Sequence, residues 1–331
     1  MDGRAIGVDV GGTFTDVALS LDGDLVTAKV ASTDDQSEGV VAGIEKACEA
    51  AGIDPESVSE FSHAMTVSVN ALLEGDGART ALVTTEGFRD VLEIGRQTRP
   101  SLYDLDAEKP TPLVPRRRRF EVAERATPEG IERPVDDGAV ESLAADLRDA
   151  DAESVAVCLL HAYATPENER RVAAGLRDAL DVPVSASHEV LPEFREYERT
   201  STTAVDAYVR PAIDGYVGRL TDRARELGLP RPRIMQANGG VTDADTVRRN
   251  AVTTVLSGPA AGVVGANATA GGDGRDRGAP DRDGLITFDM GGTSSDVSLV
   301  RDGEVERTTE SVIADRPIRT PMVDVETVGA G

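Results

Sequence analysis

Residues 6–19 of the 331-residue chain read IGVDVGGTFTDVAL, and residues 286–299 read ITFDMGGTSSDVSL. The two stretches align without a gap, and an Asp-Gly pair follows both at the same distance, at residues 22–23 and 302–303. Each predicts an apolar strand that ends in Asp, a Gly-Gly-Thr turn, and a second strand that turns at Asp-Gly into a third. The copies lie much further apart than the roughly 20–50 residues of a solenoid repeat, so they indicate a duplicated domain.

The turn of each copy has the composition of a phosphate-binding loop. Adjacent glycines allow backbone N–H groups to approach an anion without hindrance from a Cβ atom. Asp9 and Asp289, at the strand ends, are hard oxygen ligands suited to Mg²⁺ or its water shell. The hydroxyl groups that add donors for phosphate oxygens belong to Thr13, Thr15, Thr293, Ser294 and Ser295. One such loop is equally well an ordinary turn, but two copies predict a nucleotide held between two lobes.

Other nucleotide-binding and catalytic motifs are missing from the sequence. It has no Gly-Lys dipeptide for a Walker loop and no Gly-x-Gly-x-x-Gly for a Rossmann turn. A Gly-x-Ser-x-Gly elbow, a Cys-x-x-Cys pair and a His-Glu-x-x-His helix are missing too. The paired loops resemble those of the actin, sugar-kinase and Hsp70 ATPase superfamily, which implies an α/β fold. We expect duplicated actin-like (ribonuclease H-like) lobes with mixed sheets and crossover helices.

The charge of the chain excludes some classes of partner. A net charge of -24 argues against nucleic acid or an anionic membrane surface, because both require a basic protein surface. Only three lysines stand beside many arginines, and the excess of carboxylates is typical of proteins from high internal salt, so we expect a halophilic source. Cys48 and Cys158 lie far apart and fit reduced core thiols in a cytoplasmic protein, with a disulfide as the alternative.

Strand and helix patterns alternate over the first half of the chain, which predicts a mostly parallel sheet with crossover helices. The polar, irregular stretch 187–199 predicts a boundary between a domain at 1–187 and a second at 200–331. Residues 61–74 begin polar and continue as a helix, so His63, Thr66 and Asn70 are expected on one helical face, as site residues or as ordinary polar positions. Residues 257–266 predict a helix whose first amides hold an anion, unless the small residues serve close packing.

Five further stretches, in order along the chain, resemble the hydantoinase/5-oxoprolinase A-subunit family, which includes N-methylhydantoinase A and acetone carboxylase beta-like proteins: His63–Glu74, Thr84–Arg96, Arg199–Thr203, Asn238–Gly240 and Ser257–Gly262. The resemblance implies an ATP-hydrolysing cyclic amidase acting on 5-oxoproline or a hydantoin. In such enzymes ATP phosphorylates the amide oxygen, and water then opens the ring. An unstrained lactam is a poor electrophile, so phosphoryl transfer supplies the activation.

The same resemblance assigns roles by position. ATP and Mg²⁺, or another divalent metal, would be held by Asp9, Gly11, Gly12, Thr13, Thr15, Asp16, Asp289, Gly291, Gly292, Thr293 and Ser294. Asp9 and Asp289 would act in catalysis and bind the metal. Ser257 and Gly258 would reach the nucleotide. Substrate contacts would come from His63, Thr66, Asn70 and Arg96.

The end of the sequence departs from the family pattern. Where the family commonly has Asp-x-His, this chain reads Asp324-Val325-Glu326, which would change any metal or proton role of that histidine. The chain stops at Gly331 inside a glycine-rich loop, whereas A-type chains are considerably longer. We therefore expect an N-terminal fragment with an incomplete second lobe, inactive alone, whose whole protein acts with a B-type hydantoinase subunit.

Two other functions stay open at this point. The first is a subunit of an ATP-dependent carboxylase acting on acetone or acetophenone, which would use the same loops with a different acceptor. The second is an actin-like nucleotide switch or filament protein. A filament needs complementary end surfaces, which a charge of -24 disfavours at low salt.

Overall fold

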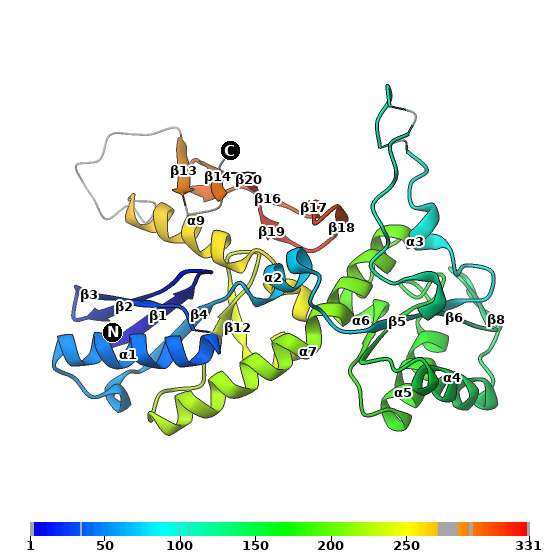
Figure 1. Ribbon diagram of the computed structural model, residues 1–331, viewed down its shortest axis with the longest axis horizontal. Helices are drawn as coiled ribbons and strands as arrows, with labels where there is room; N and C mark the ends of the chain where they lie inside the picture. The colour runs from blue at the N-terminus through cyan, green and yellow to red at the C-terminus, as the bar shows by residue number, and fades with distance from the viewer. Residues whose placement is uncertain are drawn as a thin grey trace.

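The computed structural model has a mixed α/β fold whose elements form two bodies side by side, joined by one long helix, α7 (Glu196–Glu226) (Figure 1). It describes residues 3–33, 35–98, 100–104, 106–270, 284–290 and 294–329. Each body contains its own sheet, and a third sheet of four strands carries the second copy of the repeated hairpin. Within the described ranges, no helix combines the length and apolarity that crossing a membrane requires.

The first sheet has the strand order β12-β11-β4-β1-β2-β3. Its strands are β1 (Ala5–Val10), β2 (Phe14–Leu21), β3 (Asp24–Ala31), β4 (Glu60–Ala64), β11 (Arg233–Met235) and β12 (Val241–Asp243). β1, β2 and β3 are antiparallel neighbours, as the repeat predicts, and β4 runs parallel to β1. β11 comes from beyond residue 200 and pairs in parallel with β4. The domain boundary expected between residues 187 and 200 stays a prediction. Strands from both sides of that boundary pair in this sheet.

Helix α1 (Gln36–Ala51) covers one face of this sheet because its sequence allows a close approach. Asp35 caps the helix by accepting a hydrogen bond from the backbone N–H of Ser37, and Gly52, with a φ of +66°, ends it. A Cβ atom at Gly43 would lie 2.7 Å from a methyl group of Val17 on β2. The missing side chain therefore lets α1 pack directly on the strands.

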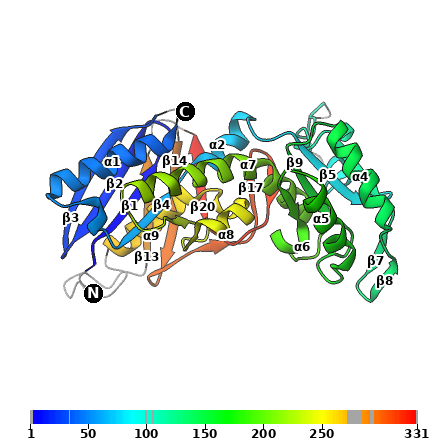
Figure 2. The same cartoon turned by 90° about the horizontal axis from the view of Figure 1, so that it is seen from below.

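The second sheet lies in the body inserted between β4 and β11. Its strands are β5 (Thr80–Thr85), β6 (Arg119–Val122), β9 (Ser154–Cys158) and β10 (Val184–Ala186), all parallel, in the order β10-β9-β5-β6. Val83 and Val157 pack against α4 (Asp137–Asp149) and α5 (Glu167–Ala179) on one face. Figure 2 shows these two helices flanking the sheet at the far end from β1. The predicted parallel sheet with crossover helices is thus present.

Helix α7 packs against both bodies, which explains why its buried face is so broad. Ala204 and Ala207 contact the parallel sheet, whereas Ile213 and Leu220 belong to the core of the first sheet. Buried threonine hydroxyls near its start donate to carbonyl oxygens one turn earlier, at 2.6–2.8 Å. The helix continues through Pro211 as a single element.

The second copy of the hairpin repeats the first in register. β13 (Gly284–Met290) pairs with β14 (Ser294–Arg301) so that Asp289 stands opposite Asp296, as Asp9 stands opposite Asp16. The third strand differs, because β15 (Glu304–Val305) forms only two residue pairs with β14, and β20 (Val325–Gly329) pairs with the rest of the edge of β14 that lies opposite β13.

The remaining helices and strands connect these sheets or lie beside them. They are η1 (Pro55–Ser57), α2 (Val67–Glu74), α3 (Val91–Ile94), η2 (Arg116–Arg118), β7 (Arg125–Thr127), β8 (Gly130–Arg133), α6 (Ser187–Val190), α8 (Ala244–Arg249), η3 (Ala251–Thr254), α9 (Ser257–Thr269), β16 (Arg307–Thr308), β17 (Ser311–Ile313), β18 (Arg316–Ile318) and β19 (Met322–Val323). In Figure 1, α9 lies between the first sheet and β13.

Candidate functional site

The first loop is a tight connection between β1 and β2. The backbone N–H of Gly11 donates to the carbonyl oxygen of Phe14 at 2.9 Å, which closes the turn. A Cβ atom at Gly11 would lie 3.2 Å from that oxygen, so a side chain there would press on the turn. Gly12 and Thr13 are exposed, and nothing lies within 4 Å of the Cβ position of Gly12. The loop therefore offers open backbone at the end of the strand that carries Asp9.

Carboxylates and one cation line the sheet face below this loop. Asp9 on β1 is opposite Asp16 on β2, which is opposite Lys29 on β3. Lys29 Nζ contacts the two carboxylate oxygens of Asp16 at 2.7 and 2.8 Å. Partial enclosure, together with the negative charges of Asp16 and Asp289, raises the pKa of Asp9 to about 6. Carboxylates that repel one another in this way are suited to a divalent cation, which would relieve the repulsion.

The start of α9 meets Asp9 from the opposite side of the cleft. A Cβ atom at Gly258 would lie 3.7 Å from Asp9 Oδ1 and 3.9 Å from Thr66 Cγ2. One turn later, a Cβ atom at Gly262 would lie 3.6 Å from Asp289 Oδ2. The two glycines therefore let one face of α9 fit between the two predicted metal ligands. The first amides of a helix have no partner within the helix and carry partial positive charge, which favours an anion here.

Ser257 is used within the protein rather than presented to the cleft. Its side chain is buried, and Oγ donates to the carbonyl oxygen of Met65 at 3.0 Å. This bond fixes the first residue of α9 against the segment before α2. The contact of Ser257 with a nucleotide stays a prediction. Because the hydroxyl is already bonded, the group that would make this contact is the backbone amide.

Thr66 and Asn70 lie at the edge of the same site. Thr66 Oγ1 donates to the carbonyl oxygen of Val10, at the end of β1, at 3.2 Å. Asn70 Nδ2 lies 3.5 Å from Thr66 Oγ1, one helical turn further along α2. Thr66 thus lies next to Gly258 and the end of β1, with Asn70 beside it, and the role of both in binding substrate stays a prediction.

A cleft of about 780 Å³ runs along this face of the first sheet. Its walls include Gly7, Asp9, Asp16 and Lys29 from the sheet, and Ala261 and Gly262 from α9. The cleft is therefore bounded by the first loop's strands on one side and by the helix that reaches Asp289 on the other.

Other predicted site residues lie elsewhere. Thr15 points to the opposite face of the sheet, where its side chain is fully buried. It lies against α1 there, since a Cβ atom at Gly39 would be 3.2 Å from its hydroxyl oxygen. Arg96 forms a two-pronged ion pair with Glu198 at 2.5 and 2.6 Å and lines a separate cavity of about 840 Å³. The roles of Thr15 and Arg96 stay predictions, since neither reaches the cleft beside Asp9.

His63 lies in the core and not on a helical face with Thr66 and Asn70. That part of the expectation is wrong, because residues 60–64 form strand β4 and the helix begins only at Val67. The imidazole is 1% exposed, and its Nε2 lies 2.8 Å from the hydroxyl oxygen of Tyr216 on α7. Burial lowers the pKa of His63 to about 4, so the ring is neutral. Its predicted contact with substrate stays a prediction.

The second loop is described only in part. Gly291, Gly292 and Thr293 lie outside the described residues, and the placement of Ser294 is known only for its backbone in β14. Asp296, opposite Asp289, accepts a hydrogen bond from Thr327 Oγ1 at 2.6 Å. In the described part of the chain, no group of three or more His, Cys, Asp or Glu side chains forms a complete metal site. Mg²⁺ commonly uses only one or two carboxylates together with phosphate oxygens.

Two residues of the site were not predicted from the sequence. Lys29 neutralises Asp16, and Gly262 makes room for Asp289. The pairing of β2 with β3 brings Lys29 opposite Asp16, so the hairpin pattern, continued through Asp22-Gly23 to a third strand, contained the signal. Gly262 carried no comparable signal, since its neighbour comes from a strand that follows much later.

Glu326 lies on β20 opposite Val297. With Leu256, Glu198 and Arg319 it borders a cavity of about 690 Å³ on the other side of the α9 start. Among the described residues, its carboxylate forms no hydrogen bond or ion pair.

Comparison with known proteins identifies related families and structures. The model of the hydantoinase/oxoprolinase N-terminal region matches residues 5–180, and the hydantoinase/oxoprolinase model matches residues 199–331. The chain is 35% identical over 337 residues to caprolactamase subunit alpha of Pseudomonas jessenii, covering 98% of this chain and 47% of that one. It is 34% identical over 358 residues to 5-oxoprolinase 1 of Arabidopsis thaliana, covering 98% of this chain and 27% of that one.

Two solved structures share the fold over almost the whole chain. The nucleotide-free structure of acetone carboxylase, described as acting by ATP-dependent acetone carboxylation, matches with a TM-score of 0.86 and 28% identity, covering 100% of this chain and 48% of that one. The ATP-dependent caprolactamase of Pseudomonas jessenii matches with a TM-score of 0.83 and 33% identity, covering 99% of this chain and 48% of that one. The chain thus spans about half the length of the solved chains, and half or less of the curated relatives it matches.

Proposed function

The chain belongs to the hydantoinase/oxoprolinase family, and on that premise we propose that the whole protein uses ATP to activate and open a cyclic amide. The observation that carries the proposal is the meeting of three elements at one cleft. Asp9, Asp289 and the first turns of α9 come from three separate parts of the chain and lie next to each other. Related proteins named caprolactamase and 5-oxoprolinase support a cyclic amide as substrate.

The chemistry that ATP supplies is phosphorylation of the amide oxygen, after which water adds to the activated carbon and the ring C–N bond breaks with release of phosphate. The residues of this chain bind and orient. Exposed backbone at Gly12 and Thr13 and the first amides of α9 are placed to donate hydrogen bonds to phosphate oxygens. We propose that Thr66, whose hydroxyl is bonded to the carbonyl oxygen of Val10, and Asn70, next to Thr66, hold the acceptor near those phosphates.

We assign a magnesium ion, or another divalent metal, to Asp9 and Asp289. Partial burial, followed by the negative charges of Asp16 and Asp289, raises the pKa of Asp9, and a bound cation would oppose the effect of those charges. We predict that the same two residues act in catalysis, since both carboxylates lie close to glycines of α9.

Phosphate release by the whole protein, with a B-type subunit that we propose as its partner, tests the function. We expect ATP turnover to depend on 5-oxoproline, a hydantoin or caprolactam, and to fall at least 100-fold in Asp9→Asn and Asp289→Asn, an effect of the size seen when a transition-state contact is removed. Turnover at the wild-type rate in both variants would rule out the site.

A ketone carboxylase subunit is the second candidate. It is favoured by the acetone carboxylase structure, whose TM-score of 0.86 covers the full chain. The same assay with acetone and acetophenone, with and without bicarbonate, separates the two functions. Turnover that needs both a ketone and bicarbonate would replace the amidase proposal with this one.

We further propose a cytoplasmic protein from a high-salt cell. Its support is a net charge of -24 and two buried cysteines that are free thiols. The unfolding midpoint measured in 0.1 M and 3 M KCl tests the salt adaptation, and a midpoint that does not rise with salt would contradict it.

A further inference from the structure

The start of α9 is held in a strained conformation. Leu256, the residue before the helix, has a φ of +64°. A residue with a large side chain adopts this left-handed region only where its surroundings hold it there. The first turn of α9 therefore depends on whatever fixes the segment just before it.

Three contacts fix that segment. Ser257 Oγ donates to the carbonyl oxygen of Met65 at 3.0 Å. Thr254 Oγ1 and Ser68 Oγ, on α2, are hydrogen-bonded to each other. The backbone N–H of Val252, a buried residue of η3, donates to Asp206 Oδ1 at 2.9 Å. The first two contacts stay within the first body, whereas the third leads to α7.

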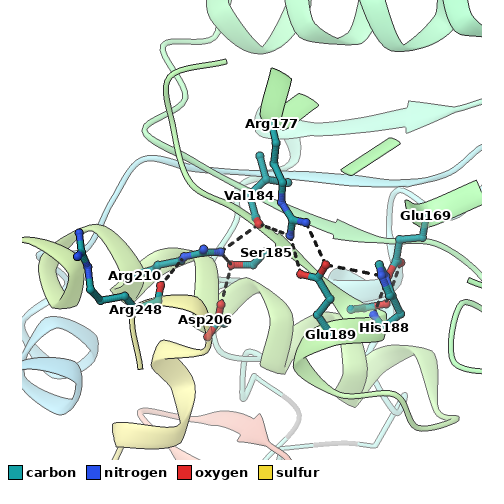
Figure 3. A network of polar contacts seen from close by, with 10 residues as sticks. Glu169, Arg177, Val184, Ser185, His188, Glu189, Asp206, Arg210 and Arg248 are labelled. Atoms are coloured by element: carbon teal, nitrogen blue, oxygen red, sulfur yellow. Dashed lines mark hydrogen bonds and ion pairs between the residues drawn. The ribbon is translucent and has the colours of Figure 1, made fainter. Parts of the chain in front are cut away.

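Asp206 is fully buried and shared between the two bodies. Its second oxygen, Oδ2, accepts a hydrogen bond from Ser185 Oγ, on β10 of the parallel sheet, at 2.6 Å. One turn further along α7, Arg210 donates to the carbonyl oxygens of Arg248 at 2.9 Å and Val184 at 3.0 Å. Figure 3 shows Asp206 and Arg210 between β10 and the end of α8. One turn of α7 thus fastens both bodies to the segment that leads into α9.

We propose that Asp206 is a positioning residue for the nucleotide site: it fixes η3 and Leu256, and through them the first turn of α9 beside Asp9. This rests on the proposed nucleotide function. Asp206 Oδ1 is the acceptor for the buried N–H of Val252, and its loss leaves that N–H without this partner. The segment before α9 then loses one of the three contacts that hold it against the strain at Leu256, and we expect the first amides of α9 to move from the place where phosphates bind.

Binding of Mg-ATP to the full chain, measured by calorimetry, tests the proposal. In Asp206→Ala we expect the dissociation constant to rise about tenfold. Asp206→Asn keeps an oxygen for the N–H of Val252 and is expected to stay within threefold of the wild type. Asp206→Ser, whose hydroxyl is too short to hold Ser185 and Val252 together, replaces the alanine variant if that one does not fold.

The matched controls act on the same network away from η3. Ser185→Ala removes the β10 partner of Asp206, together with a 3.3 Å hydrogen bond that Arg210 donates to the same hydroxyl, and leaves the contact between Asp206 and Val252 in place. Arg177→Ala removes an ion pair with Glu189, 2.6 Å long, further along the network in Figure 3. Both are expected to lower the unfolding midpoint and to leave the dissociation constant within twofold. An equal loss of affinity in Ser185→Ala and Asp206→Ala would show general loosening and would overturn the proposal.

A second variant tests the role of strain. Glycine adopts a positive φ without penalty, so Leu256→Gly in the Asp206→Ala background is expected to recover most of the lost affinity. No recovery would overturn the proposal.

Hydrogen exchange separates this inference from the function. Amides 252–258 are expected to exchange faster in Asp206→Ala than in Ser185→Ala, with or without nucleotide. If the wild type fails to bind ATP, the proposed function fails, and this exchange difference alone still supports the positioning role. Equal exchange in both variants would overturn it.

Discussion

The two copies of the hairpin share a sequence pattern and a register, but their apolar faces have opposite environments. The exposed fractions in the first copy are 2% for Ile6, 4% for Val8 and 0% for Val10, against 67% for Ile286, 62% for Phe288 and 70% for Met290 in the second. Leu19 and its counterpart Leu299 differ in the same direction, at 0% and 38%. Within the described part of this chain, the same pattern of apolar residues is therefore buried in the first copy and exposed in the second.

The difference comes from elements outside the hairpin. In the first copy, α1 and α7 pack on this face, and the missing side chain of Gly43 lets α1 come close to Val17. In the second, the matching face carries the exposed Ile286, Phe288 and Met290, so no helix of the described part of the chain covers it. A hairpin thus aligns its apolar residues on one face, but only a packed helix buries them.

The largest expected effect on stability comes from placing one aspartate on the apolar face of each hairpin copy. Val8→Asp buries a charge without a partner and should cost about 3–5 kcal/mol, enough to prevent folding. Phe288→Asp places a charge on an exposed strand and should change stability by less than about 0.5 kcal/mol. Urea unfolding of the two variants measures this, and similar losses in both would mean that the second face is also buried.

The next effect concerns His63, on the covered side of the first sheet. Burial lowers its pKa to about 4, below its value of about 6.5 in an unfolded chain. The unfolded state therefore takes up a proton first, and stability should be lost as the pH falls from about 6.5 to about 4, by roughly 3 kcal/mol. His63→Gln removes this titration, so its unfolding free energy should fall less over that range. Parallel pH profiles would contradict the burial of a neutral ring.

A smaller effect on stability comes from the titration of Asp9, whose pKa depends on the aspartates around it. The pKa of Asp9 is raised to about 6, so its proton stabilises the folded state below the unfolded value of about 4, and this contribution is lost as the pH rises through 6. In Asp9→Asn the metal-free chain should therefore lose less stability between pH 4 and 7 than the wild type. NMR titration in Asp16→Asn should show the pKa of Asp9 moving down, and a smaller shift in Asp289→Asn. A larger shift in Asp289→Asn than in Asp16→Asn would contradict the structure, because it would mean that Asp289 acts on Asp9 more strongly than Asp16 does.

The smallest effects concern the partners of the paired aspartates. Lys29→Met removes an exposed ion pair with Asp16, and Thr327→Val removes one hydrogen bond to Asp296. Each should cost less than about 1 kcal/mol in urea unfolding. Only Lys29→Met should raise the pKa of Asp9 further, because Lys29 lowers it in the wild type. An equal pKa change in both variants would show that the two copies share one electrostatic site.

Much of the site could be predicted because its chemistry is local. Asp9, Gly11 and Gly12 follow one another in a turn, and the repeat at Asp289 marks the partner strand. The hairpin register and the helix that begins at Ser257 follow from short patterns of the same kind. The five family motifs also pointed to the family that the comparisons found.

The side on which each polar residue lies could not be predicted in the same way. Alternation along β2 separates Thr15 from Asp16, but it does not say which face meets α1. His63 looked helical from its neighbours and instead joins β4, where pairing with β1 decides the conformation. Strand pairing between distant segments overrides such local preferences.

By itself, the sequence determined the duplicated hairpin, the chemistry of its loops and the family, because turn residues and strand alternation act over a few neighbours. Only the tertiary structure decided that β11 joins β4, that Gly258 and Gly262 bring α9 between Asp9 and Asp289, and that one apolar face is buried while its copy is open. Those outcomes depend on contacts between residues far apart in the chain, whose packing is set by the shape of both surfaces and not by either stretch alone.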